Sequence, residues 1–138
     1  ESDVEEFMTF DRLGEKELKK AKEFLPGLYV PTYIPEGYEF EKLEIQKYYS
    51  GDFQVVYLYE NNADTIDILL YYLTHDDIGY QWPEGDSLIE LSDRKISVGK
   101  DSISNKHIIS VYTELCSMDI SGDISKEELI SIGKGMIK

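Results

Sequence analysis

The sequence predicts an α+β domain in which a curved antiparallel sheet of about six strands carries an N-terminal helix and a C-terminal helix on one face. Two observations on periodicity support this class. Apolar residues recur at three- and four-residue spacings near both ends of the chain, and they alternate with polar residues in the middle. Prolines and glycines separate these regions. With 138 residues, the chain is expected to fold as one domain, residues 1–138.

Residues 1–25 are predicted to be helical, in one or two helices with a break near Gly14. Val4, Phe7 and Met8 have helical spacing, and "EKELKKAKE" supplies strong helix formers. Pro26 stops the second helix. The following "LYVPTYIPEGY" is rich in proline, which predicts an extended connector at the edge of the sheet.

The predicted sheet occupies residues 28–121. Leu43 and Ile45 alternate with polar residues, as in a strand with one wet face. The segments "FQVVYLYE" (53–60) and "TIDILLYYL" (65–73) are predicted strands joined by a hairpin at 61–64. Because these two strands are apolar at nearly every position, we expect them to lie centrally and to be covered on at least part of both faces.

The second half of the sheet is predicted to contain shorter strands. Residues 74–86 form a polar loop in which Trp82 is the expected anchor. Strands are then expected at 87–91 and 95–98. Residues 107–121 are predicted to form two more strands, with a turn near Thr113.

The stretch "DISGDISKEELISI" (119–132) looks like a calcium-binding loop, but its register is wrong. Counting from Asp119, the sixth position is Ile124 instead of glycine and the twelfth is Ile130 instead of glutamate. The same residues fit a capping box, in which Ser125 caps a helix and Glu128 reaches back. We therefore predict a final amphipathic helix over 125–137. Its glycines at 133 and 135 indicate either close approach of another backbone or fraying.

Three segments also carry a family resemblance. "LYVPTYIPEGYEFEKLEI" (28–45), the "VVYLYE" strand and "MDISGDISKEELISIGKGMI" (118–137) resemble an uncharacterised family of bacterial domains of unknown function, whereas residues 74–106 hold no matching motif. The resemblance implies a Gram-positive source and an extracytoplasmic position in membrane-anchored or lipid-anchored proteins, some linked to sporulation or anti-sigma regulation. It implies no catalytic residues.

Charge and composition limit the partners. The formal charge of -14 repels nucleic acid, and no apolar run is long enough to span a membrane. The chain begins with Glu1, so we expect that a natural N-terminus with a signal or an anchor has been removed, and that membrane contact occurs only through that segment. The single Cys116 excludes an intrachain disulfide, which fits a cytosolic protein or an exported protein without disulfides.

No residue pattern predicts an enzyme, a metal centre or a cofactor site. Cys116 alternates with apolar residues, which predicts a buried thiol. The sequence holds two histidines, and His75, Asp76 and Asp77 would be the residues of a metal-assisted hydrolase, the third-ranked alternative.

Aromatic residues on adjacent strands and the following loop give the candidate binding surface. Its predicted members are Tyr48, Tyr57, Tyr59, Tyr71, Tyr72 and Trp82. We therefore predict a non-catalytic extracytoplasmic sensing or interaction domain that binds a protein or a cell-envelope component. The alternative is a carrier that encloses a lipid or small amphiphile between the sheet and the C-terminal helix.

Overall fold

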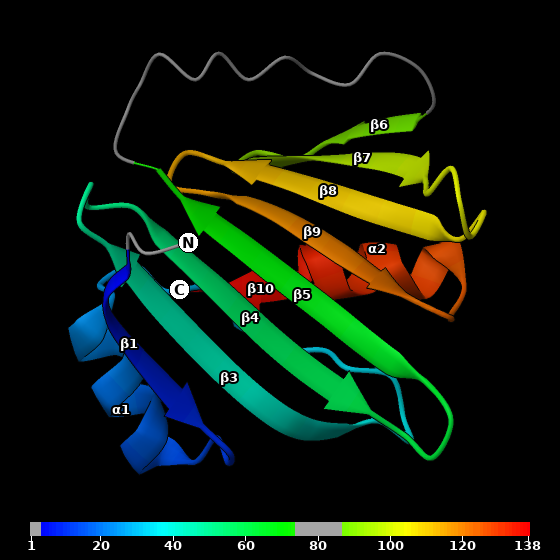
Figure 1. Ribbon diagram of the computed structural model, residues 1–138. Coiled ribbons are helices and arrows are strands. Elements are labelled where there is room, and N and C mark those ends of the chain that lie inside the picture. The colour runs from blue at the N-terminus through cyan, green and yellow to red at the C-terminus, as the bar shows by residue number, and fades with distance from the viewer. Residues whose placement is uncertain (1–3, 74–86) are drawn as a thin grey trace.

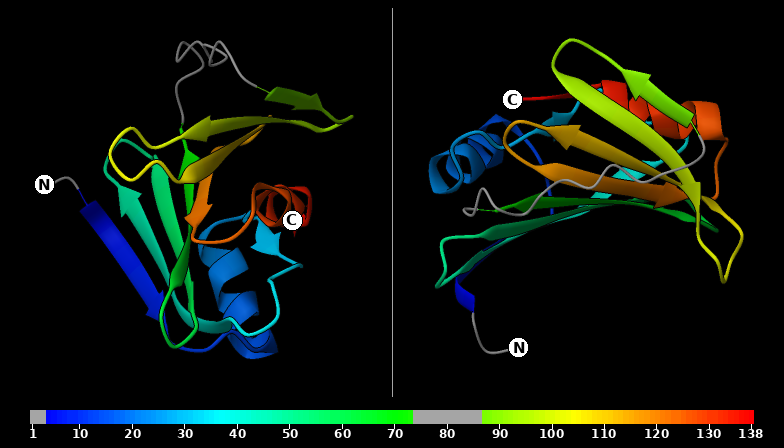
Figure 2. Two further views of the ribbon diagram at one scale, coloured as in Figure 1. Left: turned by 90° about the vertical axis from the view of Figure 1, so that its right-hand side faces the viewer. Right: turned by 90° about the horizontal axis from the view of Figure 1, so that it is seen from above.

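The computed structural model describes residues 4–73 and 87–138, and these form a large antiparallel sheet with two helices on one side (Figure 1) (Figure 2). The eight strands are ordered β1-β3-β4-β5-β9-β8-β7-β6. They are β1 (Val4–Phe10), β3 (Glu39–Tyr48), β4 (Phe53–Glu60), β5 (Thr65–Tyr72), β6 (Ser87–Glu90), β7 (Arg94–Lys100), β8 (His107–Thr113) and β9 (Ser117–Gly122). The predicted combination of antiparallel sheet and helices is confirmed, but the sheet has eight strands instead of about six.

One strand that the sequence did not predict is β1, where helix was expected. Val4–Phe10 pairs antiparallel with β3, and Met8 lies opposite Ile45. The segment is short and rich in β-branched and aromatic residues, so pairing with the exposed edge of β3 outweighs its weak helical spacing. The predicted break near Gly14 is confirmed, because the helix α1 (Glu15–Phe24) begins directly after this residue.

Helix α1 covers the sheet near β4. Ala21 is fully buried, and the rings of Phe24 and Phe53 meet edge to face with their centroids 5.8 Å apart. The connector that follows does not lie at the edge of the main sheet, where the sequence predicted it. Its residues Val30–Pro31 form β2, which pairs with β10 (Met136–Ile137) in a separate two-stranded ribbon.

The C-terminal helix α2 (Lys126–Lys134) lies under β7, β8 and β9. Ser125 Oγ accepts a hydrogen bond of 3.1 Å from the Glu128 amide, which confirms the predicted N-cap. The Glu128 carboxylate does not complete the capping box, and instead accepts a 3.3 Å hydrogen bond from the Tyr33 hydroxyl. The helix ends three residues earlier than predicted, because Met136 and Ile137 belong to β10.

Strand order explains how the two halves of the sheet join. β5 pairs with β9 and not with β6, the next strand in the sequence. β6 forms the far edge of the sheet, and β7, β8 and β9 follow in order back towards β5. β4 and β5 are therefore central, as predicted, but the described helices cover one of their faces and not parts of both. Figure 2 shows that both helices lie on the same side of these strands, and no helix of the described residues covers the opposite side.

The core lies between the sheet and the helices. Alternate residues of β4 and β5, among them Val55, Tyr57, Ile66 and Ile68, are fully buried on the helix side. None of the helices in the described ranges has the length and apolar composition needed to cross a membrane.

Candidate functional site

The face of the sheet opposite the helices, called the open face below, is defined by the register of its strands. Gln46, Gln54, Tyr71 and Ser117 are consecutive cross-strand partners, so their side chains point to this face. All four side chains are partly exposed. The other central positions of the face are Lys42, Glu44, Tyr48, Val56, Leu58, Asp67, Leu69, Ile108, Ser110, Tyr112, Asp119 and Ser121.

Tyr48 fixes the side chains of two glutamines on the open face. Its hydroxyl lies 3.0 Å from Gln46 Oε1 and 2.8 Å from Gln54 Oε1. A phenol has a single proton, so it can donate to only one of these oxygens, and the other amide must turn its NH2 group to the hydroxyl. The phenol and both amides are therefore held in one network.

A cleft of about 400 Å³ adjoins this network at the β3–β4 turn. Tyr48, Gln54 and Tyr71 form part of its wall, together with Tyr49, whose side chain is 72% exposed. Burial raises the pKa of Tyr71, and the Asp119 carboxylate and Tyr48 raise it further. An aromatic cleft with a few fixed polar groups has the usual composition of a small binding site.

Two carboxylates continue the open face beyond Tyr71. Asp119 lies opposite Leu69, and its Oδ1 accepts a 3.0 Å hydrogen bond from the Ser110 hydroxyl. Asp67 lies opposite Ser121, and its Oδ1 is buried without a hydrogen-bond partner among the described residues. A buried carboxylate oxygen without a donor is unfavourable.

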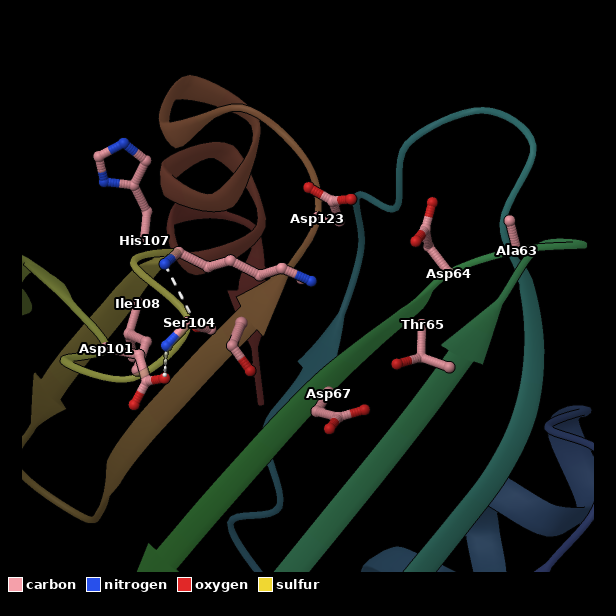
Figure 3. Close-up of a pocket in the computed structure, with 12 residues that line it drawn as sticks. Ala63, Asp64, Thr65, Asp67, Asp101, Ser104, His107, Ile108 and Asp123 are labelled. Carbon is pink, nitrogen blue, oxygen red and sulfur yellow. Dashed lines mark hydrogen bonds between the residues drawn. The ribbon is translucent and has the colours of Figure 1, made fainter.

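A second hollow, of about 510 Å³, lies at the end of the open face near the β4–β5 turn (Figure 3). Asp64, Asp67 and Asp123 lie on one side of it, and Asp101 lies on the other. The Ser104 amide donates a 2.8 Å hydrogen bond to Asp101 Oδ2 and holds the pKa of this carboxyl below its usual value. Within residues 4–73 and 87–138, no three His, Cys, Asp or Glu side chains are arranged to hold a metal ion.

The structure divides the predicted aromatic surface between the two sides of the sheet. Tyr48 and Tyr71 lie on the open face, whereas Tyr57, Tyr59 and Tyr72 are in the core, with exposed fractions of 0%, 7% and 8%. The prediction that these three contribute to an exposed surface is therefore wrong. Trp82 lies outside the described residues, as do His75, Asp76 and Asp77.

The buried tyrosines have a structural role that explains their position. The Tyr57 hydroxyl donates a 2.8 Å hydrogen bond to the Tyr29 carbonyl, and the Tyr72 hydroxyl accepts one of 2.8 Å from the Tyr29 amide. The Tyr72 hydroxyl also donates a 3.0 Å hydrogen bond to the Gly27 carbonyl. These bonds attach the connector after α1 to the central strands. Tyr59 packs edge to face against Phe40, with ring centroids 5.6 Å apart.

Cys116 is a core residue, as the sequence predicted. It is fully buried, and burial raises the pKa of its thiol to about 11. Gln46, Gln54, Ser110 and Asp119 also belong to the open face, and the aromatic pattern of the sequence did not point to them. The sequence signal that could have identified them is the spacing of polar residues along the strands. Gln54 and Asp67 are polar positions in two otherwise apolar strands, so they mark the side that faces solvent.

No curated protein matches this chain. The predicted resemblance to an uncharacterised domain family is confirmed at the level of the family. The family model described as a domain of unknown function, DUF4367, matches residues 28–136, which include both helix-side and open-face residues of β3 to β9. With most of its length matched, the chain belongs to the DUF4367 family.

Proposed function

We propose that this chain is a non-catalytic sensing or interaction domain that lies outside the cytoplasm, in a membrane-anchored or lipid-anchored protein of a Gram-positive bacterium. It binds a protein or a cell-envelope component on the open face. One observation carries the proposal: both helices pack on one side of the sheet, and the other side presents an ordered aromatic and polar surface with a cleft.

The chemistry of the described residues favours binding over catalysis. The Cys116 thiol is buried and its pKa of about 11 disfavours the reactive thiolate. The Tyr48 network holds neutral groups, which suit recognition by hydrogen bonds and ring contacts. A metal-assisted hydrolase would depend on His75, Asp76 and Asp77, which lie outside the described residues.

The carrier alternative receives no comparable support. It requires space between α2 and the sheet, where Leu129, Ile132 and Gly133 are all buried. A Cβ on Gly133 would already lie 2.9 Å from Val111 Cγ2, so helix and sheet are in direct contact there. The open-face proposal is therefore preferred.

Crosslinking in living cells tests the binding surface. A photoreactive phenylalanine analogue replaces Tyr49, which lines the cleft, or Tyr33, which is 39% exposed and contacts α2. These positions are matched controls because both are exposed tyrosines outside the sheet core. Crosslinked products that form from position 49 and not from position 33 support the proposal. Equal yields, or products from position 33 alone, refute it.

Labelling of intact cells tests the location. A membrane-impermeant amine reagent should label the lysines of the full-length protein before lysis, while a cytoplasmic marker protein stays unlabelled. Protection of the domain until the cells are lysed would contradict an extracytoplasmic position.

A further inference from the structure

Carboxylates outnumber lysines on the open face and in the hollow at its end. On the strands, Glu44, Asp67 and Asp119 share the face with Lys42 and Lys95. The hollow at its end adds Asp64, Asp101 and Asp123, and also Lys106. Three ion pairs of the described residues, Arg12 with Glu17, Lys47 with Glu5, and Arg94 with Asp93, involve none of the central carboxylates. The face therefore carries a net negative charge, and its central carboxylate residues are partly exposed.

Apolar and aromatic groups lie between these carboxylates. Val56 and Leu69 are direct cross-strand partners, and Leu58 follows on the same face of β4. All three are partly exposed. Tyr71 is two residues beyond Leu69 and is thus diagonal to Asp119. The surface alternates between apolar contacts, a phenol ring and negative charge.

This combination matches the side chains of lysine and arginine. Their aliphatic stems pack on apolar surface while their charged heads reach outward. A cationic head is attracted to the face of a tyrosine ring, and it donates charge-assisted hydrogen bonds to carboxylates. Asp67 and Asp119 supply such carboxylates on the neighbouring strands β5 and β9.

We propose that the open face docks a basic, extended segment of a partner protein. This inference rests on the proposed function and names the chemistry of its partner. Charge complementarity favours this occupant over two others, since an anionic polymer or a second copy of the chain would be repelled by a charge of -14. From β3 to β8 the face is roughly 20 Å across, which about six extended residues would span.

The binding test uses a fluorescent oligolysine of about eight residues and a neutral glycine-serine peptide of the same length. Fluorescence anisotropy measures affinity at low and physiological salt. Oligolysine should bind more tightly than the neutral peptide, and its affinity should fall as salt increases. Amide chemical shifts should change in β4, β5 and β9, and not in α1. Equal binding of both peptides would overturn the proposal.

Two variants separate a docking site from diffuse attraction to an acidic protein. Asp119→Asn removes one charge from the open face, and the amide oxygen can still accept from Ser110. Glu23→Gln removes one charge from the exposed side of α1. We expect about a tenfold weaker affinity for Asp119→Asn and less than about twofold for Glu23→Gln, because charges beyond the Debye length are screened. Equal effects would refute a local site.

Competition keeps this inference distinct from the proposed function. If oligolysine binds and suppresses crosslinking from position 49, both are supported. If position 49 forms a crosslink that oligolysine does not reduce, the open face binds something other than a basic segment, and only this inference fails. If position 49 forms no crosslink, the proposed function fails.

Discussion

Gly133 of α2 lies against Val111 of β8 so closely that a Cβ on the glycine would stand 2.9 Å from Val111 Cγ2. Val111 is fully buried and β-branched, so it has little freedom to move away. We predict that Gly133→Ala destabilises the fold by about 1 kcal/mol. Overpacking costs about 1–3 kcal/mol, and the higher helix propensity of alanine offsets about 1 kcal/mol of this.

Urea unfolding measures this effect against two comparisons. Ser131→Ala, on the exposed side of α2, should leave the free energy of unfolding unchanged or slightly raised. Val111→Ala should reduce the cost of Gly133→Ala, because it removes the contacting methyl group. A Gly133→Ala protein as stable as the wild type would show that the contact is not close.

Arg94 joins the end of α2 to the sheet. Its Nη1 donates a 2.9 Å hydrogen bond to the Gly133 carbonyl, and its guanidinium lies 5.7 Å from the centroid of the Tyr29 ring. Arg94→Met should lower the free energy of unfolding by about 2–3 kcal/mol, because the carbonyl loses a charged donor. Asp93 also binds this guanidinium, but its side chain is 62% exposed. Asp93→Asn should therefore cost about 1 kcal/mol or less. Denaturant unfolding measures both variants, and an equal loss of unfolding free energy in the two would contradict the larger contribution predicted for Arg94.

Much of the fold could be predicted because its patterns are local. Leu43 and Ile45 alternate with polar residues, and Ser125 caps a helix, so these elements form as expected. The strand β1 could not be predicted in this way. Its helical spacing and its strand composition compete, and pairing with β3, which is distant in sequence, decides between them. The early end of α2 depends likewise on β2, whose contact with Met136 is long-range.

The candidate site was harder to predict than the fold. In β4 and β5 both faces are largely apolar, so the single polar residues Gln54 and Asp67 were the local sign of which tyrosines point inward. Tyr57 and Tyr71 have the same local composition around them, yet one is fully buried and the other is partly exposed. Cross-strand register decides, and it depends on the bulge between Phe40 and Lys42 as well as on hairpin geometry.

Three core tyrosines give a test of hydroxyl hydrogen bonds. Tyr72→Phe removes a donor to Gly27 and an acceptor for the Tyr29 amide, and Tyr57→Phe removes a donor to the Tyr29 carbonyl. Each change should cost about 1–3 kcal/mol, since it leaves buried backbone groups without partners. Tyr59→Phe is the matched control and should be nearly neutral, because its principal described contact is the ring of Phe40. Urea unfolding of the three variants measures the difference.

The same tyrosines should make the protein sensitive to alkali. Burial raises the pKa of Tyr59 from 10.0 to about 12, and it raises the pKa of Tyr57 and Tyr72 further. The folded state thus keeps protons that the unfolded state releases, so the stabilisation is complete below pH 10 and is lost as pH rises towards 12 and beyond. Each such group contributes at most about 1.4 kcal/mol per pH unit in this window. The free energy of unfolding should therefore fall between these two values, and a burst of tyrosinate absorbance should accompany unfolding. In Tyr59→Phe the free energy of unfolding should fall less steeply with pH, because one titrating group is absent. An unchanged slope in that variant would mean that Tyr59 ionises without unfolding.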